Sequence, residues 1–505
     1  MMESAPPPPT PLSRLLALAR SRRAWVVLMV AAGIAYGWFL TTWGTSVASS
    51  SDASGYFNQA QRFDSGRVID DVRVIPGLNP PKWNYYYQQP LGFRALPQDG
   101  RMAPTYPIGM PVMLLGAARL VGWDHAAVLV NVLCALGCGG LFIAFGRAHC
   151  GLRPGWLALG VGLIAFSPLF VFFSLQPMSD MPATFWVLLA LYAAAQRSSG
   201  LGWGLLAGAA AGVAVLVRPT NALLAVPLLI LLGGRWQSWL ACIAGGLPFA
   251  TALAFYNHHV YGAVLTTGYG DVSGLLGPQF LAHNAAHFAR WIPTLLTPFV
   301  ALALGAPYGF RLGRRAGLAL TAWCLCLVGF YAFYFHSGET WWYLRFILPA
   351  FPTLLLLALM TGQRLSDRIE IAWLRATLPA ALLAIAIPVL MASNRQLGVL
   401  GIRSVETNYR RGIEWLEQNA PADAVMAAMQ MSGTLHFYTN HALIRYDLTP
   451  PKEFARAVAA ARAQGREIYA PLFPFEVGRL VTPRFGGEWE QVGTVDFITI
   501  WRLKP

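Results

Sequence analysis

Charged residues are scarce in this chain of 505 residues. They make up only 12% of the sequence, whereas hydrophobic residues make up 56% and the mean hydropathy is +0.48. A soluble globular protein carries about 25% charged residues. The shortage of charge therefore excludes a soluble fold and predicts an α-helical polytopic membrane protein.

Cysteine is also rare, and its six occurrences follow no pattern. Most lie within apolar segments: Cys134, Cys138, Cys150, Cys242, Cys324 and Cys326. This spacing excludes a disulfide framework and predicts small core residues instead. The histidines between residues 258 and 288 lack regular ligand spacing. We therefore predict surface or loop histidines there, and no metal site.

Acidic residues are rarest in the first 400 positions. That part holds 12 Asp and Glu against 25 Lys and Arg, whereas the rest holds 11 against 12. The basic excess falls in short loops between apolar runs, such as those at Arg147, Arg197 and residues 311–315. Basic loops of this kind are cytoplasmic in membrane proteins. The net charge of +14 therefore predicts contact with membrane lipids, and no nucleic acid partner.

Eleven segments come close to the roughly 20 apolar residues that a membrane span needs. They are 24–43, 125–146, 154–174, 180–196, 201–217, 219–234, 238–257, 289–309, 315–336, 344–361 and 371–391. A twelfth segment, 106–122, is short and holds Arg119. If it lies on the membrane surface as an interfacial helix, all the arginine-rich loops are cytoplasmic. The sequence thus predicts about 11 spans, with the N-terminus inside and the C-terminus outside.

The chain is expected to have three parts. Residues 1–23 are a predicted disordered cytoplasmic tail, and residues 24–392 form the transmembrane domain, which begins with an uncleaved signal anchor and includes a long outer loop at 44–124. Residues 405–505 have ordinary charge and alternating elements, which predict a small extracytoplasmic α/β domain with its own core. Strands are expected in AVMAAMQ, REIYAPLF and, around a turn, EWEQVGTVDFITIWRL. A helix is expected in EFARAVAAARAQG.

On this topology, four segments face the outer side together: residues 44–124, 176–182, 258–288 and 336–346. Nine of the twelve acids before residue 400 fall on this side or at its interface. Acids are costly within a bilayer, so their placement is informative. We expect the functional site at this face.

Asp52 opens the stretch SDASGYFNQAQRF. An apolar stripe behind it, formed by Tyr56, Phe57, Ala60 and Phe63, predicts a helix that lies on the bilayer and holds Asp52 beside the bundle. From spacing alone, Asp52 is either a catalytic acid or a helix cap or first-turn acid.

Three further charged positions allow two interpretations each. Asp180 begins another span, where it is either functional or only a first-turn acid. Arg218 precedes a proline at a span end, where it either serves a site or reaches toward the headgroups. Glu339 lies three residues after His336 and six before Arg345, a spacing that also suits a structural ion pair.

Five motifs follow one another in the order of a known family. They are SDASGYFNQAQRF at 51–63, PTYPIGMPVMLLGAARLVGW at 104–123, SLQPMSDMPATFWVLLAL at 174–191, LVRPTNALLAVPLLILL at 216–232 and YLRFILPAFPTLLLLAL at 343–359. With the outer domain, this order resembles the GT-C glycosyltransferases. It is most similar to the bacterial branch related to protein O-mannosyltransferases and aminoarabinose (lipid A) transferases. Many relatives carry two adjacent acids in the first loop, whereas Ala53 follows Asp52 here. A second acid then comes from elsewhere or is not needed.

The resemblance implies an inverting membrane glycosyltransferase that uses a polyprenyl-phosphate sugar donor. Asp52 would be the general base, and Arg345 and Arg218 would stabilise the leaving phosphate, with Lys82 and His336 behind them. Asp180 would bind sugar hydroxyls. Tyr56 and Glu339 complete the expected substrate-binding set.

The resemblance also implies a location and partners. The site and the C-terminal domain would lie on the periplasmic face of a bacterial inner membrane. The transferred sugar would be a hexose or a pentose, and the acceptor an envelope glycolipid, a polysaccharide or a protein. Some GT-C branches use a divalent metal ion and others do not, so no cofactor is certain.

Two other functions compete with the transferase. A transporter or flippase of lipid-linked sugar would carry inverted repeats and charges at mid-membrane, and the sequence shows no repeat. A polysaccharide polymerase or ligase would rely on arginines and a histidine in a late loop. The acid at the start of the first loop favours the transferase.

Overall fold

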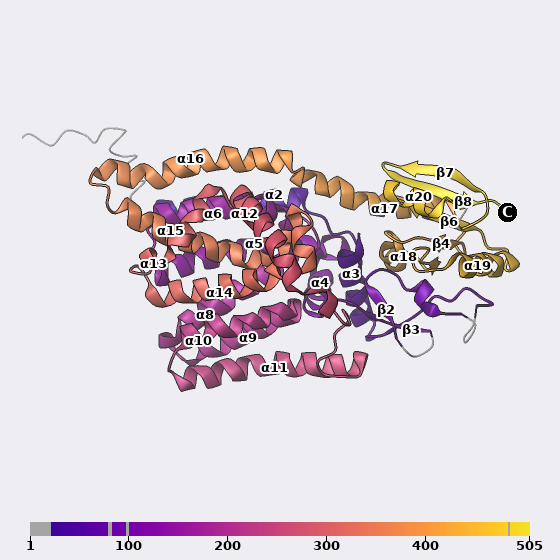
Figure 1. Cartoon of the computed structure of the whole chain (residues 1–505), viewed down its shortest axis with the longest axis horizontal. Helices are drawn as coiled ribbons and strands as arrows, with labels where there is room; N and C mark the ends of the chain where they lie inside the picture. Colours follow the sequence, from indigo (N-terminus) through magenta and orange to yellow (C-terminus); the bar gives the residue numbers. More distant parts are fainter. Residues whose placement is uncertain (1–21, 79–82, 97–99, 483–484) are drawn as a thin grey trace, which may run out of the picture.

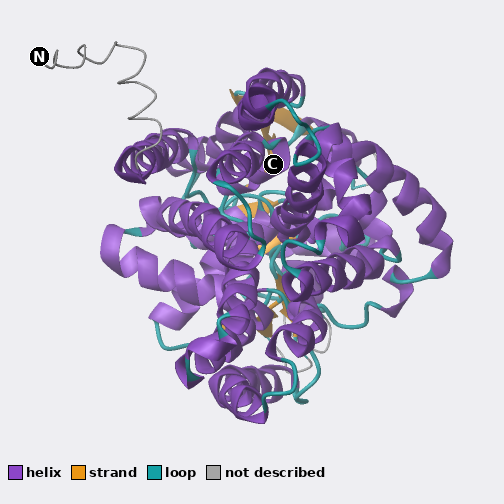
Figure 2. Cartoon of the chain, turned by 90° about the vertical axis from the view of Figure 1, so that its left-hand side faces the viewer, coloured by secondary structure: helices purple, strands orange, loops and turns teal. Residues whose placement is uncertain are grey.

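The computed structural model describes residues 22–78, 83–96, 100–482 and 485–505. Most of the predicted tail 1–23 lies outside the described residues, and so does Lys82. Figure 1 shows an elongated molecule with a long helical bundle on one side and an α/β region on the other. Viewed along the long axis from the bundle, the helices lie in front and the strands lie behind them (Figure 2).

The bundle consists of long helices joined by short connections and 3-10 turns. Its α-helices are α2 (Arg22–Trp43), α5 (Trp123–His149), α6 (Pro154–Phe166), α7 (Pro168–Ser174), α8 (Asp180–Ala195), α9 (Leu201–Val217), α10 (Ala225–Leu232), α11 (Trp236–Tyr261), α12 (Leu281–Leu296), α13 (Ala306–Gly309), α14 (Arg314–Ala332), α15 (Phe351–Ser366) and α16 (Ala372–Gln396). Its 3-10 helices are η2 (Arg197–Ser199), η3 (Pro219–Leu224), η4 (Ser273–Leu275), η5 (Pro278–Phe280), η6 (Pro298–Gly305), η7 (Phe335–Gly338), η8 (Trp341–Ala350) and η9 (Val399–Gly401).

Within the described residues, 6 helices are long and apolar enough to cross a membrane, or up to 8 if each bent helix pair counts as one span. The pairs bend by 60° between α6 and α7 and by 114° between α12 and η6. Both bends coincide with a proline, Pro168 and Pro298, which lacks the N–H that continues a helix. The shorter apolar helices α8, α9 and η3–α10 cover the remaining expected spans. The count of about 11 spans stays a prediction.

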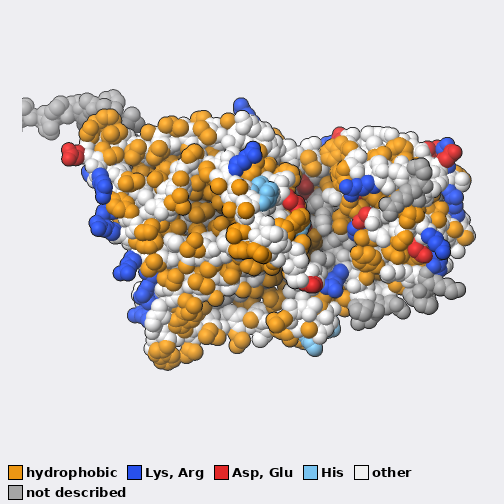
Figure 3. Space-filling model, in the orientation of Figure 1, with side chains coloured by type: hydrophobic (Ala, Val, Ile, Leu, Met, Phe, Trp, Pro, Cys, Tyr) orange, Lys and Arg blue, Asp and Glu red, His pale blue; other side chains and the backbone are white. Residues whose placement is uncertain are grey.

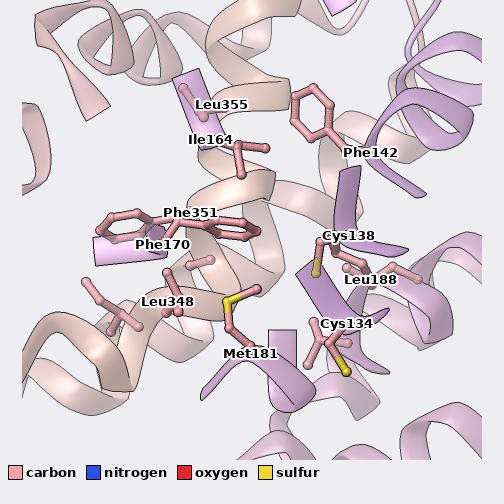
Figure 4. Packing of buried hydrophobic residues seen from close by; sticks show 14 of the residues in the cluster. Cys134, Cys138, Phe142, Ile164, Phe170, Met181, Leu188, Leu348, Phe351 and Leu355 are labelled. Atoms are coloured by element: carbon pink, nitrogen blue, oxygen red, sulfur yellow. The ribbon is translucent and has the colours of Figure 1, made fainter. Parts of the chain in front are cut away.

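The centre of the bundle is a dry apolar core. Figure 4 shows how its side chains meet between neighbouring helices, among them Cys134, Cys138, Phe142, Met181, Leu188, Phe351 and Leu355. Five of the six cysteines are buried and none is in a disulfide, which confirms the prediction of core residues. Large apolar residues such as Phe255 on α11 and Trp38 on α2 remain exposed on the outside, as expected for surfaces that face lipid.

Arginines gather at the end of the bundle that lies away from the α/β region. Figure 3 shows them along this edge. We call this the far end, defined by residues 147–153, 195–200, 233–236, 311–315 and 364–372. Contacts join these loops: Arg153 pairs with Asp367, and Arg197 donates to the carbonyl of Leu232. The opposite end, beside the α/β region, is called the junction end.

The long first loop folds over the junction end. It contains α3 (Ser51–Asp64), β1 (Asp70–Asp71), η1 (Tyr85–Gln88), β2 (Phe93–Ala95), β3 (Arg101–Pro104) and α4 (Gly109–Val121). The three strands form an antiparallel sheet in the order β1-β3-β2. Gly109 packs on the backbone of Val217, and Arg119 pairs with Asp64. Both ends of α4 therefore lie at the junction end.

Helix α3 forms where it was expected, but its apolar stripe packs against protein and not against lipid. Tyr56, Phe57 and Ala60 are almost completely buried. The Phe57 ring meets Trp123 at the start of α5 and Phe437 of the α/β region. The sequence prediction was wrong on this point because the partner of the stripe lies nearly 400 residues away in the chain.

The α/β region contains α17 (Ile402–Asn419), β4 (Val425–Ala427), α18 (Ser432–Tyr438), β5 (Ala442–Ile444), α19 (Pro451–Ala463), β6 (Ile468–Leu472), α20 (Pro474–Leu480), β7 (Trp489–Val495) and β8 (Ile498–Leu503). Its sheet has the order β5-β4-β6-β8-β7, parallel on one side and antiparallel where β8 joins. The predicted strands β4, β6, β7 and β8 and the predicted helix α19 are confirmed. Strand β5 was not predicted.

The core of the α/β region also includes residues of the first loop. Ile75, Leu78 and Trp83 belong to the same buried cluster as Val425 and Phe454. The Asp70 carboxylate meets the imidazole of His436 at 2.9 Å, and both side chains are buried. The α/β region and the first loop therefore form one packed unit.

Glu406 links this unit to the residues just before α3. Its carboxylate is 4% exposed and accepts a hydrogen bond from the hydroxyl of Ser49. Burial raises its pKa to about 7, although the Ser49 bond opposes the rise. The next residue, Ser50, has φ 47°, a conformation that is strained for a residue with a side chain.

We expect stability to fall as the pH rises through the Glu406 pKa. An unfolded Glu has a pKa of about 4.3, so between there and about pH 7 the folded protein binds the extra proton. The contribution of Glu406 to native stability should be most favourable near its unfolded pKa and should decline by about 3 kcal/mol toward neutral pH. Glu406→Gln should remove this decline.

Thermal unfolding of the purified protein in detergent, scanned between about pH 5 and pH 8, tests the prediction. Glu414→Gln, on an exposed part of the same helix, is the matched control and should follow the native profile. An identical pH profile for the native chain and Glu406→Gln would contradict the assignment.

Candidate functional site

Two carboxylate–arginine pairs lie beneath the first loop at the junction end. The Asp52 carboxylate is 2.6 Å from Nη2 of Arg345, and the Asp180 carboxylate is 2.6 Å from Nη2 of Arg218. The Nη1 atom of Arg218 also donates to the carbonyl of Arg345, at 3.5 Å. Four charges from distant parts of the sequence thus form one cluster, which we call the paired-charge site.

Each of the four charges lies at an irregularity in the helical structure. Asp52 and Asp180 occupy the first turns of α3 and α8, where the exposed N–H groups favour an acid. Arg218 follows α9 with an extended backbone, because the residue before a proline avoids the helical conformation. Arg345 lies in the 3-10 helix η8, before α15 begins.

The paired-charge site is partly shielded from water. The side chains of Asp52 and Arg345 are 18% and 16% exposed, and those of Asp180 and Arg218 are 0% and 12% exposed. The Ser179 hydroxyl links Tyr56 to Arg218. It accepts hydrogen bonds from the Tyr56 hydroxyl at 3.0 Å and from Nε of Arg218 at 3.3 Å.

Aromatic rings form one wall of the site. The guanidinium carbons of Arg218 and Arg345 lie 5.5 and 5.2 Å from the centre of the Phe346 ring. This ring is stacked on Tyr331. Such contacts attract a cation while they exclude water. Both arginines are therefore held on the same ring.

A second group of aromatic rings lies beside Asp52. Tyr106 packs 5.1 Å from Tyr56 and 6.0 Å from Tyr269, between ring centres. Its hydroxyl lies 2.7 Å from the hydroxyl of Ser51. The segments 44–124, 176–182, 258–288 and 336–346, which were expected to face one side, do meet here.

The site keeps Asp52 ionised. Burial alone would raise the pKa of the Asp52 carboxyl, but the Arg345 guanidinium and the Tyr106 hydroxyl lower it below its usual range. Among the four charged residues of the site, two buried atoms have no hydrogen-bond partner within the described part of the chain: Oδ2 of Asp180 and Nε of Arg345. Buried polar groups are nearly always satisfied, so these atoms indicate where a ligand would bind.

His336 and Glu339 lie at the rim of the site and not inside it. They form the expected ion pair at 2.5 Å, and their side chains are 34% and 36% exposed. His336 stacks on Tyr343, which in turn contacts Phe346. Lys82 lies outside the described residues, so its expected role stays a prediction.

The alternative reading of Arg218, in which it reaches toward the headgroups, is wrong, because its guanidinium turns inward to a buried acid. A second acid, Asp180 at the start of α8, lies in the same cluster as Asp52. Asp52 and Asp180 are first-turn acids as the simpler interpretation held, yet each also binds an arginine.

Sequence reasoning missed Tyr106, Ser179, Tyr269 and Phe346. Ser179 and Tyr106 stand inside motifs that were singled out, beside a candidate acid and a proline-rich turn. Hydroxyls in such loops were a usable signal. No sequence signal distinguished Tyr269 and Phe346 as site residues, because aromatic residues are common in this chain.

The described residues contain no group of three or more His, Cys, Asp or Glu side chains that could hold a metal ion. Asp52 and Asp180 are each paired with an arginine and do not form a ligand set. The expectation of loop histidines was wrong for His283 and His287, which lie on α12, where their Nε2 atoms meet the backbone carbonyls of Gly338 and Thr340.

Several solved structures resemble this chain over almost its whole length. The crystal structure of ArnT from Cupriavidus metallidurans bound to undecaprenyl phosphate matches with a TM-score of 0.60 and 14% identity, over 95% of this chain and 98% of that one. The apo ArnT structure matches at a TM-score of 0.60 and 15% identity, over 95% and 98%.

The cryo-EM structure of the arabinofuranosyltransferase AftD from Mycobacteria matches with a TM-score of 0.53 and 15% identity, over 96% of this chain and 40% of that one. No protein-family model matches the sequence, and no curated protein matches it. ArnT and AftD are GT-C glycosyltransferases, and the likeness shows that this chain shares the GT-C fold.

The Asp180–Arg218 pair makes a testable contribution to stability. Arg218→Met leaves a fully buried carboxylate without its partner, which should destabilise the protein by about 3–5 kcal/mol. Adding Asp180→Asn to this variant should recover most of the loss, because no unpaired charge then remains buried. Thermal unfolding in detergent measures both effects.

The exposed Arg119–Asp64 pair is the matched control. Its side chains are 66% and 44% exposed, so Arg119→Met should change stability by less than about 1 kcal/mol. If Arg218→Met is as stable as Arg119→Met, the buried pair does not stabilise the junction end.

Proposed function

We propose that this protein is an inverting glycosyltransferase that moves a sugar from a polyprenyl-phosphate donor to an acceptor in the bacterial cell envelope. The observation that carries the proposal is the Asp52–Arg345 pair, which places a carboxylate base beside a cation that suits a phosphate. The shared GT-C fold supports it, and so does ArnT, whose structure contains undecaprenyl phosphate.

The proposed reaction is a single displacement at the anomeric carbon. The acceptor hydroxyl attacks this carbon from the face opposite the phosphate, and Asp52 takes the hydroxyl proton. The new bond from the acceptor oxygen to the sugar forms as the bond to the phosphate oxygen breaks. The polyprenyl phosphate leaves with the bonding electron pair, and the anomeric configuration inverts.

Arg345 and Arg218 would stabilise the charge that develops on the leaving phosphate. Both are held in a partly dry site, where a fixed cation acts more strongly than in water. Nε of Arg345 has no partner within the described residues and is free to bind a phosphate oxygen. The free Oδ2 of Asp180 would accept a hydrogen bond from a sugar hydroxyl.

The pairing also couples donor binding to base activation. Without donor, Arg345 is engaged by Asp52. A phosphate that binds Arg345 would compete for the same guanidinium and weaken the hold on the Asp52 carboxylate. Asp52 would then become more basic once the donor is bound, which suits a general base.

The membrane orientation follows from the arginines at the far end. Basic loops face the cytoplasm, so the paired-charge site and the α/β region would lie on the periplasmic face of a bacterial inner membrane. There the donor's lipid would reach the site from the bilayer. The acceptor would be an envelope glycolipid, a polysaccharide or a protein.

Replacement of Asp52 tests the base directly. Asp52→Asn keeps the shape but cannot take a proton, so transfer should fall by about 10²–10⁴ while donor binding persists. The measurement is transfer from radiolabelled polyprenyl-phosphate hexoses and pentoses in membranes, at matched expression. Asp64→Asn, on the exposed end of the same helix, should keep full activity.

Two outcomes would contradict the proposal. Normal transfer by Asp52→Asn would leave Asp52 as a structural acid. A native protein that transfers no sugar, but moves a lipid-linked sugar across proteoliposomes, would be a flippase.

Replacement of Arg345 should change the pH dependence of transfer. Arg345 lowers the Asp52 pKa, so Arg345→Gln should raise that pKa and move the acid limb of kcat/KM to higher pH. Arg345→Lys keeps a cation and should leave the acid limb near its native position. Transfer should be slower, because lysine lacks the planar guanidinium that donates two hydrogen bonds at once. Initial rates from about pH 4 to pH 8 give the position of the acid limb of kcat/KM for each variant. If Arg345→Gln and Arg345→Lys have the same acid limb, Arg345 does not set the pKa of Asp52.

A further inference from the structure

A second basic site lies at the far end of the bundle, apart from the paired-charge site. A cavity of about 230 Å³ opens there between the ends of several helices. It is lined by His149, Ala195, Leu231, Gly313, Arg314, Arg315 and Ala316. Helix α8 separates the two sites, with Asp180 at its first residue and Ala195 at its last, about 24 Å apart.

The cations around this cavity are not neutralised. Within the described part of the chain, the side chains of Arg314 and Arg315 are exposed and make no hydrogen bond or ion pair. The residues that line the cavity include no Asp or Glu. A side chain built on Gly233 would meet Nη2 of Arg315 at 3.0 Å and Nη1 of Arg197 at 2.7 Å. Two guanidinium groups thus approach the same point with no carboxylate between them.

A polar atom of the cavity wall is also unsatisfied. Nε2 of His149 is buried and has no hydrogen-bond partner within the described residues. Such an atom calls for a partner, because buried polar groups are almost always hydrogen-bonded. The ring is fixed by contacts with Phe145 and Tyr192, so it cannot turn freely to find one.

We propose that this cavity binds the phosphate group of an anionic ligand. Arg314 and Arg315 supply charge-assisted donors, and His149 supplies a donor from Nε2. The N-terminus of α14, which begins at Arg314, adds N–H groups that favour an anion. The apolar walls at Ala195 and Leu231 suit the carbon atoms beside a phosphate ester.

The phosphate could belong to a lipid headgroup or to a soluble molecule, and the exposed apolar residues nearby favour the lipid. Leu229 on α10 and Leu318 on α14 are 57% and 41% exposed next to the cavity-lining residues. They offer acyl chains a surface within one or two turns of the charged groups.

Binding to the purified full-length protein in detergent tests the proposal. The probes are a short-chain phosphatidylglycerol and inorganic phosphate, each titrated by calorimetry. R314Q/R315Q removes two charges from the cavity, and Ala195→Leu fills it without changing charge. Both should weaken binding roughly tenfold or more, since each charge-assisted bond is worth over 1 kcal/mol.

R147Q/R311Q is the matched control, because it removes two exposed arginines at the same end that do not line the cavity. Its affinity should equal that of the native protein. Binding of the phosphatidylglycerol with this pattern identifies a lipid site, and the same pattern for inorganic phosphate alone identifies a soluble ligand. The proposal is overturned if both double variants lose affinity equally, if Ala195→Leu binds normally, or if neither probe binds the native protein.

Discussion

Four charges buried in two pairs are the constraint on which the junction end depends. Removing an ion from water costs several kcal/mol, and only a close partner of opposite sign offsets that cost. Asp180 is completely buried and Asp52 largely so, and each meets an arginine at 2.6 Å. The four helical elements that carry these residues can therefore hardly move apart, because separation would leave a charge unpaired in a dry environment.

The membrane dictates where such charges can stand. A helix that crosses the bilayer tolerates ionised side chains at its ends, and Asp180 and Arg218 lie where α8 begins and α9 stops. Prolines at 219 and 298 interrupt regular helix on this part of the chain. Interrupted helix is acceptable where protein packs around it, and here η3 packs on α9 and α14 while η6 packs on α15 and α12.

Much of the architecture was readable from the sequence because apolar runs and basic loops are long-range signals. The strands β4, β6, β7 and β8 were likewise visible as short apolar runs or, for β7 and β8, as two segments around a turn. Pairing was not readable: nothing in the sequence says that Asp52 meets Arg345 and not Arg218, since the partners are separated by 293 residues. The burial of α3 was missed for the same reason, because its stripe is completed by Phe437.

The α/β region is needed to enclose α3, which carries the proposed base. Helix α4 of the same loop covers one side of α3, and α18 covers another: Gly433 packs directly on Ser54, and its carbonyl accepts a hydrogen bond from Asn58. The first loop returns the contact by inserting Ile75 and Trp83 into the core of the α/β region. Each part completes the hydrophobic surface of the other. Thus the low exposure of Asp52, on which its pairing with Arg345 depends, is a property of the whole junction and not of the bundle alone.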